Sequence, residues 1–473
     1  MISHQLTSMI EAPLKLLPSL LLAISLAGCG APRVCTAEEL TVALAEAAPG
    51  DTVLVAACRI SGAFTVPAGV SVEGTTGSVL FSIEGSAPIL DVTVGTGSRI
   101  EGLELEVDHG GMGIRGRGEG ILALSHLKIR VTRGIGVGLR GIGAEILDVD
   151  VSGPITEANA LFASTNPAET GTVGLVAAEV GAGTVTIEGL HASGFSVAAV
   201  AVGGGTLTWH GSSIADHPDV NGTGTLGIGL FGTNATLDSV EVGNMFSGLG
   251  QPGVAIAVGP DAAGTGSLHA TELLVRSGEG YGIFADRTTV TLTTAGFFGL
   301  GLAGLRIQGG ALSATDLDCT NNGGAGILAI DAESITVERG RLDAQRSVAF
   351  NTAIGSQIIG DGLEIVRDPM SGDLAPPLDL RLVDVTLARN ERAGLVLDAA
   401  NGAIARLELI NVSVLSEGAA LGAITQRSSP DAGWDAMVSR SGAALTNDAA
   451  FTDEISVLGI MMPPASLPDL LGL

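Results

Sequence analysis

The sequence offers one pair of carboxylates whose spacing suits acid–base chemistry. Asp316 and Asp318 alternate with Leu317 and Cys319, so on a strand both carboxylates would point outward on the same side. Two residues of strand rise separate them by about 6.8 Å, within the range that inverting glycoside hydrolases use for acid and base. Any Asp-x-Asp on a strand gives the same separation, and a solvated outer face is the competing interpretation. The pair is therefore our candidate catalytic site only if the protein is an enzyme.

Two further groups of polar residues are candidates for binding. Asp216-His217-Pro218-Asp219, with His210 upstream, is the densest cluster of His and Asp, although these residues are also ordinary turn formers. Asn321 and Asn322 could act as polar ligands, but adjacent asparagines at a turn more often stack on neighbouring turns. The chain contains no phosphate-binding loop, dinucleotide-binding fingerprint, HExxH or GxSxG motif. The sequence therefore assigns no metal site.

The elements that would position these residues form a repeat. Gly304-Leu305-Arg306-Ile307 returns 22 positions later as Gly326-Ile327-Leu328-Ala329, and Leu312 is answered by Ile335. Each unit is a short apolar alternation, a Gly or Asn turn, a second alternation and another turn. Strands that repeat with a period in the twenties indicate successive coils of a solenoid.

The same glycine-led alternation recurs along most of the chain. Period-two alternation sends the apolar residues inward, and we expect the frequent glycines to supply corners with positive φ. The pattern resembles the repeats of pectate-lyase-like proteins, most recognisably at 321–327, and the resemblance covers residues 50 to 460. It implies an all-β chain folded as a right-handed parallel β-helix. A sandwich or propeller fits less well, because aromatic residues make up only 3% of the chain. The clearest alternations are Ile135-Val137-Leu139, Val200-Val202, Leu226-Ile228-Leu230, Val254-Ile256-Val258, Ile283, Leu305-Ile307, Ile327 and Leu395-Leu397.

The catalytic motifs that this resemblance implies are missing. The polygalacturonase-like branch would require Asn-Thr-Asp, Asp-Asp, Gly-His-Gly and Arg-x-Lys, and only Ala314-Thr315-Asp316 comes near the first. Pectate lyases use acidic calcium ligands and a basic residue that takes a proton beside a uronate. Lysine is confined to positions 15 and 128, so an arginine would have to be that base, and Arg306, Arg339 and Arg341 suit it by position alone. The sequence names no cofactor, with calcium left open.

The N-terminus reads as a targeting segment rather than as part of the fold. An apolar run from Leu16 to Leu26 is too short to span a bilayer but suits a signal peptide. It ends in Leu26-Ala27-Gly28-Cys29, which resembles the lipobox of bacterial lipoproteins, and that resemblance implies lipidation of Cys29. Gly30 stands where that family carries an Asp for inner-membrane retention, so we expect an outer-membrane anchor, facing either the periplasm or the cell surface. The alternative is an ordinary secretory signal.

A short helix and two cysteines follow this segment. Thr36-Ala37-Glu38-Glu39 is a capping box, and the helix that it begins resembles the N-terminal cap of parallel β-helix proteins. Cys35 precedes this helix and Cys58 ends the next strand, so a disulfide between them would staple the cap in an oxidising compartment. Cys319 is in phase with Leu317 and should be a buried small hydrophobic residue.

The sequence thus divides into four parts. They are a signal peptide at 1–28, a lipidated tether at 29–35, a β-helix domain at 36–460 and a tail at 461–473 that either hangs free or caps the far end. Four segments that break the period are expected to project as loops. They are Pro154–Gly171, Ala215–Thr223, Gln345–Pro377 and Gln426–Thr446.

Charge limits the choice of partner. A formal charge of −27 opposes nucleic-acid binding and repels polyanions unless cations bridge them. We therefore expect a non-enzymatic binding or structural rod, attached to the outer membrane by lipid and recognising a polysaccharide or a protein. The alternative is a polysaccharide lyase or glycoside hydrolase that works on the outer face of the β-helix.

Overall fold

The computed structural model describes most of the chain between residues 33 and 451. Cys29, the proposed signal segment and the proposed tail at 461–473 lie outside the described residues. No helix in the described part is long and apolar enough to cross a membrane. The described residues are 33–82, 87–108, 110–154, 172–181, 183–211, 219–221, 226–245, 252–261, 264, 266–352, 355–366, 378–398, 404–415, 422–427, 438–441, 444–445 and 450–451.

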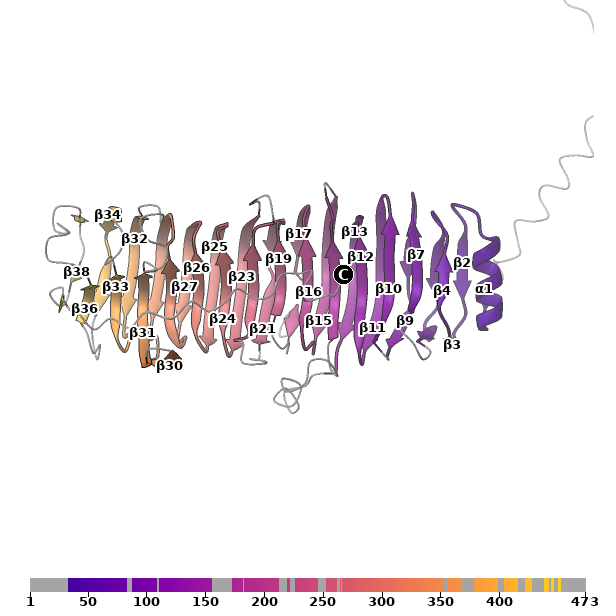
Figure 1. The fold of residues 1–473 in the computed structure, drawn as a ribbon, viewed down its shortest axis with the longest axis horizontal. Helices are drawn as coiled ribbons and strands as arrows, with labels where there is room; N and C mark the ends of the chain where they lie inside the picture. Colours follow the sequence, from indigo (N-terminus) through magenta and orange to yellow (C-terminus); the bar gives the residue numbers. More distant parts are fainter. Residues whose placement is uncertain are drawn as a thin grey trace, which may run out of the picture.

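One parallel sheet, sheet B, runs along the rod in Figure 1. It has 16 strands, and β30 (Val348–Thr352) stands apart from the main path because it pairs antiparallel with β31. The stacked strands are β4 (Phe64–Val66), β7 (Pro88–Val94), β10 (Gly111–Gly118), β12 (Gly134–Arg140), β14 (Thr172–Ala178), β16 (Ala198–Gly203), β19 (Leu226–Phe231), β22 (Val254–Gly259), β24 (Tyr281–Asp286), β26 (Ala303–Gln308), β28 (Gly324–Ile330), β31 (Gly355–Val366), β33 (Ala393–Asp398), β36 (Gly422–Arg427) and β39 (Ala450–Phe451).

The second sheet, sheet A, contains 23 strands and forms the other two sides of the rod. Long strands bend in the middle and so contribute to both sides, whereas elsewhere two short strands do the same work. The long strands are β11 (Ile121–Val131), β13 (Gly143–Ser152), β15 (Thr184–Ser193), β23 (Ser267–Gly278), β25 (Thr289–Leu300), β27 (Ala311–Thr320), β29 (Ser334–Asp343) and β32 (Leu378–Ala388). The short strands are β1 (Arg33–Val34), β2 (Thr52–Val55), β3 (Arg59–Ser61), β5 (Ser71–Gly74), β6 (Val79–Phe81), β8 (Arg99–Glu101), β9 (Glu104–Val107), β17 (Thr206–His210), β18 (Val220–Asn221), β20 (Asn234–Asp238), β21 (Glu241–Met245), β34 (Ile404–Ile410), β35 (Ser413–Leu415), β37 (Val438–Ser441) and β38 (Ala444–Leu445).

The coils stack residue on residue. Leu305 pairs with Ile283 and Ile327 in sheet B, and Leu312 pairs with Val290 and Ile335 in sheet A. These inward side chains are fully buried in one core cluster that extends through the rod. The expected fold, a right-handed parallel β-helix, is therefore confirmed.

Many glycines supply corners with positive φ as expected, for example Gly309 and Gly310, but Gly304 and Gly326 within the sheet B strands have a different role. Gly304 and Gly326 do not take positive φ; they lie where a Cβ would approach the carbonyl oxygen of the next coil, at 2.7 Å from Gly326 and 2.6 Å from Gly362. Ala199 and Ala255 occupy this column in two other coils, and Ile89 occupies it in β7 near the N-terminal end. Glycine serves close packing at these positions.

The helix α1 (Ala37–Glu46) caps the N-terminal end of the rod in Figure 1. The capping box is formed: Glu39 N–H donates to Thr36 Oγ1 at 3.2 Å, and the Glu39 carboxylate accepts from the backbone N–H of Thr36 at 3.1 Å. Leu40 and Leu44 are buried against the first coils and continue the core cluster. The cap thus covers the end where unpaired strands would otherwise face water.

Two of the four segments expected to be loops include strands that pair within the two sheets. Residues 345–377 include the hairpin of β30 with β31, and the second half of β31 is a regular member of sheet B that pairs with β28 and β33. The hairpin lengthens this coil and hides its period. Residues 426–446 include β37 and β38, which pair with β34 and β35. The segment 155–171 lies outside the described residues, and of 215–223 only 219–221 are described.

Candidate functional site

The candidate carboxylates lie at a corner that repeats along the rod. Each bent strand of sheet A turns at one residue with left-handed φ, and the pairing of neighbouring strands stacks these residues in one column. Asp and Asn tolerate this conformation better than most residues with a side chain, and they recur here. The non-glycine members have φ between 51° and 56°: His126, Asp148, Ser239, Glu272, Thr294, Asp316, Arg339, Asp384 and Asn411.

The corner changes the geometry expected for the acid pair. Asp316 has φ of 56°, which interrupts the period-two alternation of the strand. Ala314 and Leu317 are successive inward residues, and two residues rather than one lie between them. Asp316 is exposed at the bend, and Asp318 is half-buried on the next side of the rod. The sequence interpretation of two carboxylates on one straight strand is therefore wrong, because a left-handed residue re-aims the chain between them.

Each carboxylate also has a partner. Asp316 accepts hydrogen bonds from Arg339 of the next coil, at 2.7 Å from Nε and 3.0 Å from the terminal nitrogen. The hydrogen bonds from Arg339 lower the pKa of Asp316 below its usual value. Asp318 accepts from the Thr320 hydroxyl two residues further along the strand. A carboxyl group held in its ionised form is a poor general acid near neutral pH, since that role requires a raised pKa.

A shallow, open depression of about 420 Å³ lies beside this corner. Glu272, Asp316 and Asp318 stand around an apolar floor that includes Leu274 and Ala295. Glu272 accepts a hydrogen bond from the Ser239 hydroxyl at 2.9 Å. Over the described ranges, no group of three or more His, Cys, Asp or Glu residues is placed to hold a metal ion. The depression thus brings three carboxylates to one place on the surface.

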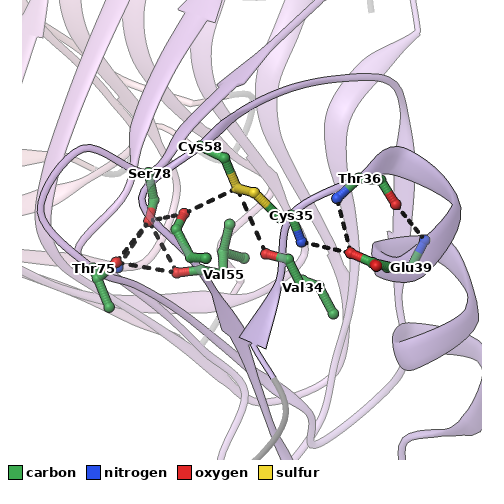
Figure 2. The surroundings of a disulfide bond; sticks show 9 residues. Val34, Cys35, Thr36, Glu39, Val55, Cys58, Thr75 and Ser78 are labelled. Atoms are coloured by element: carbon green, nitrogen blue, oxygen red, sulfur yellow. Dashed lines mark hydrogen bonds between the residues drawn. A yellow bond between two sulfur atoms is a disulfide. The ribbon is translucent and has the colours of Figure 1, made fainter.

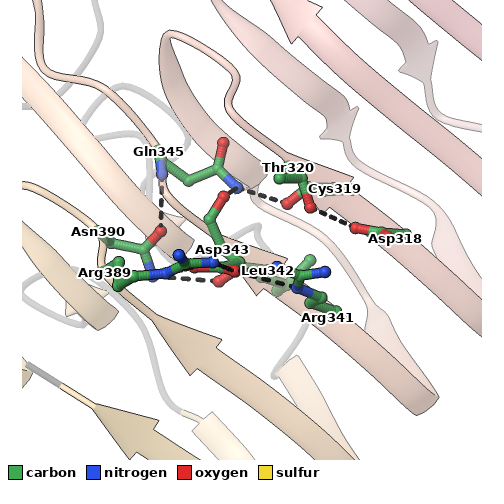
Figure 3. A network of polar contacts seen from close by, with 9 residues as sticks. All are labelled: Asp318, Cys319, Thr320, Arg341, Leu342, Asp343, Gln345, Arg389 and Asn390. Atoms are coloured by element: carbon green, nitrogen blue, oxygen red, sulfur yellow. Dashed lines mark hydrogen bonds and ion pairs between the residues drawn. The ribbon is translucent and has the colours of Figure 1, made fainter.

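A ladder of buried amides lies behind the next corner. Asn322 donates to the carbonyl oxygen of Phe297 at 3.1 Å and accepts from the N–H of Leu300 at 3.0 Å. Its own N–H donates to Gln345 Oε1 at 3.0 Å. The N–H of Gln345 in turn donates to Asn390 Oδ1 at 3.1 Å (Figure 3). Asn322 therefore satisfies turn backbone inside the rod and is not available to a ligand, whereas Asn321 stands exposed at the corner with φ of 60°.

An ion-pair network lies beside this ladder in Figure 3. Asp343 is buried and accepts from Arg341 at 2.5 Å and from Arg389 Nε at 2.9 Å. Burial by itself would raise the pKa of Asp343, but the hydrogen bonds from Arg389 and Arg341 outweigh it, and the pKa lies below its usual value. The network joins two coils whose residues are 46 positions apart in sequence.

The three arginines considered as a base are thus all in contact with other groups. Arg339 holds Asp316, and Arg341 holds Asp343. Arg306 is fully buried, donates to Tyr281 Oη at 3.2 Å and lies over the Phe284 ring at 4.8 Å. Position in the sequence suggested that these residues could serve a lyase. In the structure Arg339 and Arg306 instead contact residues of the preceding coil, and Arg341 contacts Asp343 of its own strand.

The cysteines and histidines complete the sequence candidates. Cys35 and Cys58 are joined by a disulfide beside the cap, with Cα atoms 5.7 Å apart (Figure 2). Cys319 is a free, buried thiol whose pKa is raised by burial. His210 Nδ1 lies 2.9 Å from Asp238 Oδ2 of the neighbouring coil. Asp219 accepts from the backbone N–H of Glu241 at 2.8 Å, which ties neighbouring coils together.

Sequence reasoning missed a second apolar surface on the outside of sheet B. We call it the sheet B strip. Its outward side chains are buried like those of the core, although they form a separate cluster. The signal was present, because these strands are apolar at both alternating positions rather than at one. Its members are Val173, Val176, Ala178, Ala198, Ala201, Leu226, Val254, Ala257, Tyr281, Phe284, Ala303, Ala325, Leu328, Ile330, Ile359 and Val366.

Buried charges lie on the same face. Arg392 pairs with Asp361, and its guanidinium is 3.1 Å from Glu364 Oε1. Burial raises the pKa of Asp361, although the charge of Arg392 opposes that effect. Such a network is costly to desolvate and is held together by mutual pairing. It continues the strip towards the C-terminal end of the rod, since Ala325 pairs with Asp361 in the next coil.

Comparisons with known proteins find only distant structural similarity. No protein-family model and no curated protein matches the chain. The solved structure of the A-module of the Azotobacter vinelandii mannuronan C-5 epimerase AlgE6 is similar over 89% of this chain and 95% of its own, with 12% identity and a TM-score of 0.31. A variant of the periplasmic alginate epimerase AlgG covers 89% of this chain and 84% of its own, with 10% identity and a TM-score of 0.33. The strand pairing defines the class of this protein, a parallel β-helix.

Proposed function

We propose that this protein is a non-enzymatic binding rod, anchored by lipid at Cys29 to the outer membrane and facing the periplasm or the cell surface. The observation that carries the non-enzymatic part is the pairing of Asp316 with Arg339 at a corner that other coils build with His, Thr or Asn. A corner position that accepts such different side chains is needed for its backbone conformation and not for the chemistry of one side chain. The carboxylate with the best claim to catalysis is also held ionised there.

The ligand-binding surface that we favour is one flat side of sheet A, which we call the hydroxyl face. Over seven coils its outward side chains are exposed or half-buried and are mostly Thr and Ser, while the residues between them fill the core. Strand pairing stacks these hydroxyls in columns that run along the rod. Successive hydroxyls of one column are about 4.8 Å apart. The face comprises Thr184, Thr186, Thr206, Thr208, Thr236, Ser267, Thr271, Thr289, Thr291, Thr293, Ser313, Thr315, Ser334 and Thr336.

The chemistry of this face suits a long neutral ligand. Hydroxyl groups donate and accept hydrogen bonds, and their regular spacing matches a polymer better than a compact molecule. The net charge of −27 disfavours a polyanion. A neutral polysaccharide is therefore the first choice, and a protein partner is the second.

The binding test uses the full chain with Cys29→Ser, which keeps it soluble, against insoluble neutral and anionic polysaccharides with and without calcium. Co-sedimentation with a neutral polymer should be lost in Thr208→Arg with Thr236→Arg, which places two bulky cations on the hydroxyl face. Thr132→Arg adds the same group at an exposed threonine that follows β11 and should bind normally. Binding that survives the double substitution would exclude this face.

The enzymatic alternative is tested with the same panel. Release of unsaturated or reducing ends, abolished by Asp316→Asn, would overturn the proposal in favour of a lyase or hydrolase.

The lipid anchor has its own test. The parent chain should fractionate with outer membranes and Cys29→Ser should not, and continued sedimentation of the variant would show that another feature anchors the protein.

A further inference from the structure

The side chains of the sheet B strip point away from the core of the rod, yet they are as buried as core residues. Ala257 is 2% exposed and Phe284 3%, whereas the outward Thr208 on sheet A is exposed. Among the described elements, the sheet B strands that carry the strip contact only strands of their own and neighbouring coils. Outward apolar side chains that are this well buried need a cover, and a segment of the same chain is the simplest one.

The position of the described C-terminal end makes one segment of the chain a natural cover. β39 pairs with β36, so Phe451 lies on sheet B itself. Ten strand-to-strand steps separate β39 from β14, where the strip is still apolar. At about 4.8 Å a step this is about 48 Å, and the 22 residues that follow Phe451 can extend over about 70 Å. That length is enough to cover the strip.

The composition of residues 452–473 matches the strip. Ten of these 22 residues are large and apolar, and their charged residues are only Asp453, Glu454 and Asp469. Three prolines, at 463, 464 and 468, cannot donate to a strand ladder, which disfavours another coil and suits a segment that lies across strands. The apolar residues are Ile455, Val457, Leu458, Ile460, Met461, Met462, Leu467, Leu470, Leu471 and Leu473.

We propose that residues 452–473 fold back along the rod and dock on the sheet B strip. The segment then acts as a strap that buries an apolar face. A consequence follows for binding: sheet B is closed to partners, and ligands meet the rod on sheet A.

The test measures access to the strip by thiol labelling. Ala257→Cys places a small thiol on the strip, and Thr208→Cys places one on the hydroxyl face, both in the full chain with Cys29→Ser. The buried Cys319 adds little background. The thiol introduced at 257 should label at least about tenfold more slowly than that at 208. Leu458→Asp with Leu470→Asp should abolish this protection, because the segment can no longer bury its apolar side chains.

The matched control is Ser456→Asp with Ser466→Asp, which adds the same charge to the same segment at polar positions and should keep the protection. Circular dichroism and an intact Cys35–Cys58 bond show that each variant keeps its solenoid. Protection that persists after the leucine substitutions would overturn the proposal. So would rapid labelling at 257 in the parent, and so would protection that depends on protein concentration, which would indicate a second copy on the strip.

A photoactivatable cross-linker on the thiol introduced by Ala257→Cys identifies the occupant directly. Peptide mapping should place the adduct within residues 452–473 of the same chain. Adducts confined to any other segment would assign the cover to that segment instead.

Discussion

Asp316 and Arg339 occupy the same corner of successive coils, and the guanidinium of Arg339 holds the carboxylate of Asp316 through two hydrogen bonds, of 2.7 and 3.0 Å. Both residues have left-handed φ, 56° and 54°. The pair is exposed to solvent, so water screens it and it contributes little to stability. The backbone conformation is the stronger constraint.

The first prediction separates these two contributions. Asp316→Val forces a β-branched side chain into left-handed φ and should cost about 1–3 kcal/mol. Asp316→Gly keeps the conformation and loses only a solvent-screened ion pair, so it should destabilise the fold much less than Asp316→Val does. Ser313→Val, on the extended part of the same strand, should be within about 0.5 kcal/mol of the parent. Urea unfolding monitored by tryptophan fluorescence measures all three, and equal losses at 316 and 313 would refute the corner argument.

The second prediction concerns two adjacent asparagines. Asn322→Ala leaves the buried Leu300 N–H and Phe297 C=O without their partner and should cost about 2–4 kcal/mol. Asn321→Gly suits the left-handed φ of the exposed corner and should be neutral or slightly stabilising. Thermal unfolding of the two variants tests this contrast. A mild effect at Asn322 would mean that water replaces the amide there.

The third prediction is a pH dependence. The pKa of Asp343 is lower in the folded chain than in the unfolded one, so its ionisation stabilises the fold above the unfolded pKa. This contribution is lost as pH falls through the lower, folded pKa. The same sign holds for Asp91, whose pKa is lowered by hydrogen bonding to Arg115. The urea midpoint should therefore fall on acidification below about pH 4.

Asp343→Asn should remove part of that dependence and cost about 1–3 kcal/mol at neutral pH, where Arg341 and Arg389 lose their shared carboxylate. Asp316→Asn provides the control, because the exposed Asp316 contributes little at any pH. A midpoint for Asp343→Asn that changes with acid as steeply as that of the parent would contradict this assignment.

The fourth prediction concerns the disulfide at the cap. A non-reducing peptide map should link Cys35 to Cys58 and leave Cys319 free. Reduction should lower the unfolding temperature of the parent, since a bond that closes a loop of this length contributes about 2–4 kcal/mol. The double substitution Cys35→Ser with Cys58→Ser should start at the lower temperature and respond to no reductant. Free thiols at all three positions would show that the cap is not stapled.

The sequence by itself determined the coils, the cap and the inward residues. Each of these depends on contacts within one coil, where alternation of period two and a capping box are local signals. Leu305 and Leu312 are inward by their alternation, and both are buried. It also placed Cys319 in the core by its phase with Leu317, because strand geometry alone decides that direction.

Only the tertiary structure decided what the outward residues do. Asp316 meets Arg339 because coil length sets the register, and Asp343 meets Arg389 across a coil lengthened by a hairpin. The left-handed φ at Asp316 has no signature in the local sequence, because residues as different as Thr294 and Arg339 take the same conformation at this corner. The strip on sheet B is likewise a property of stacking: single outward side chains such as Ala257 become a continuous surface only when the coils lie side by side.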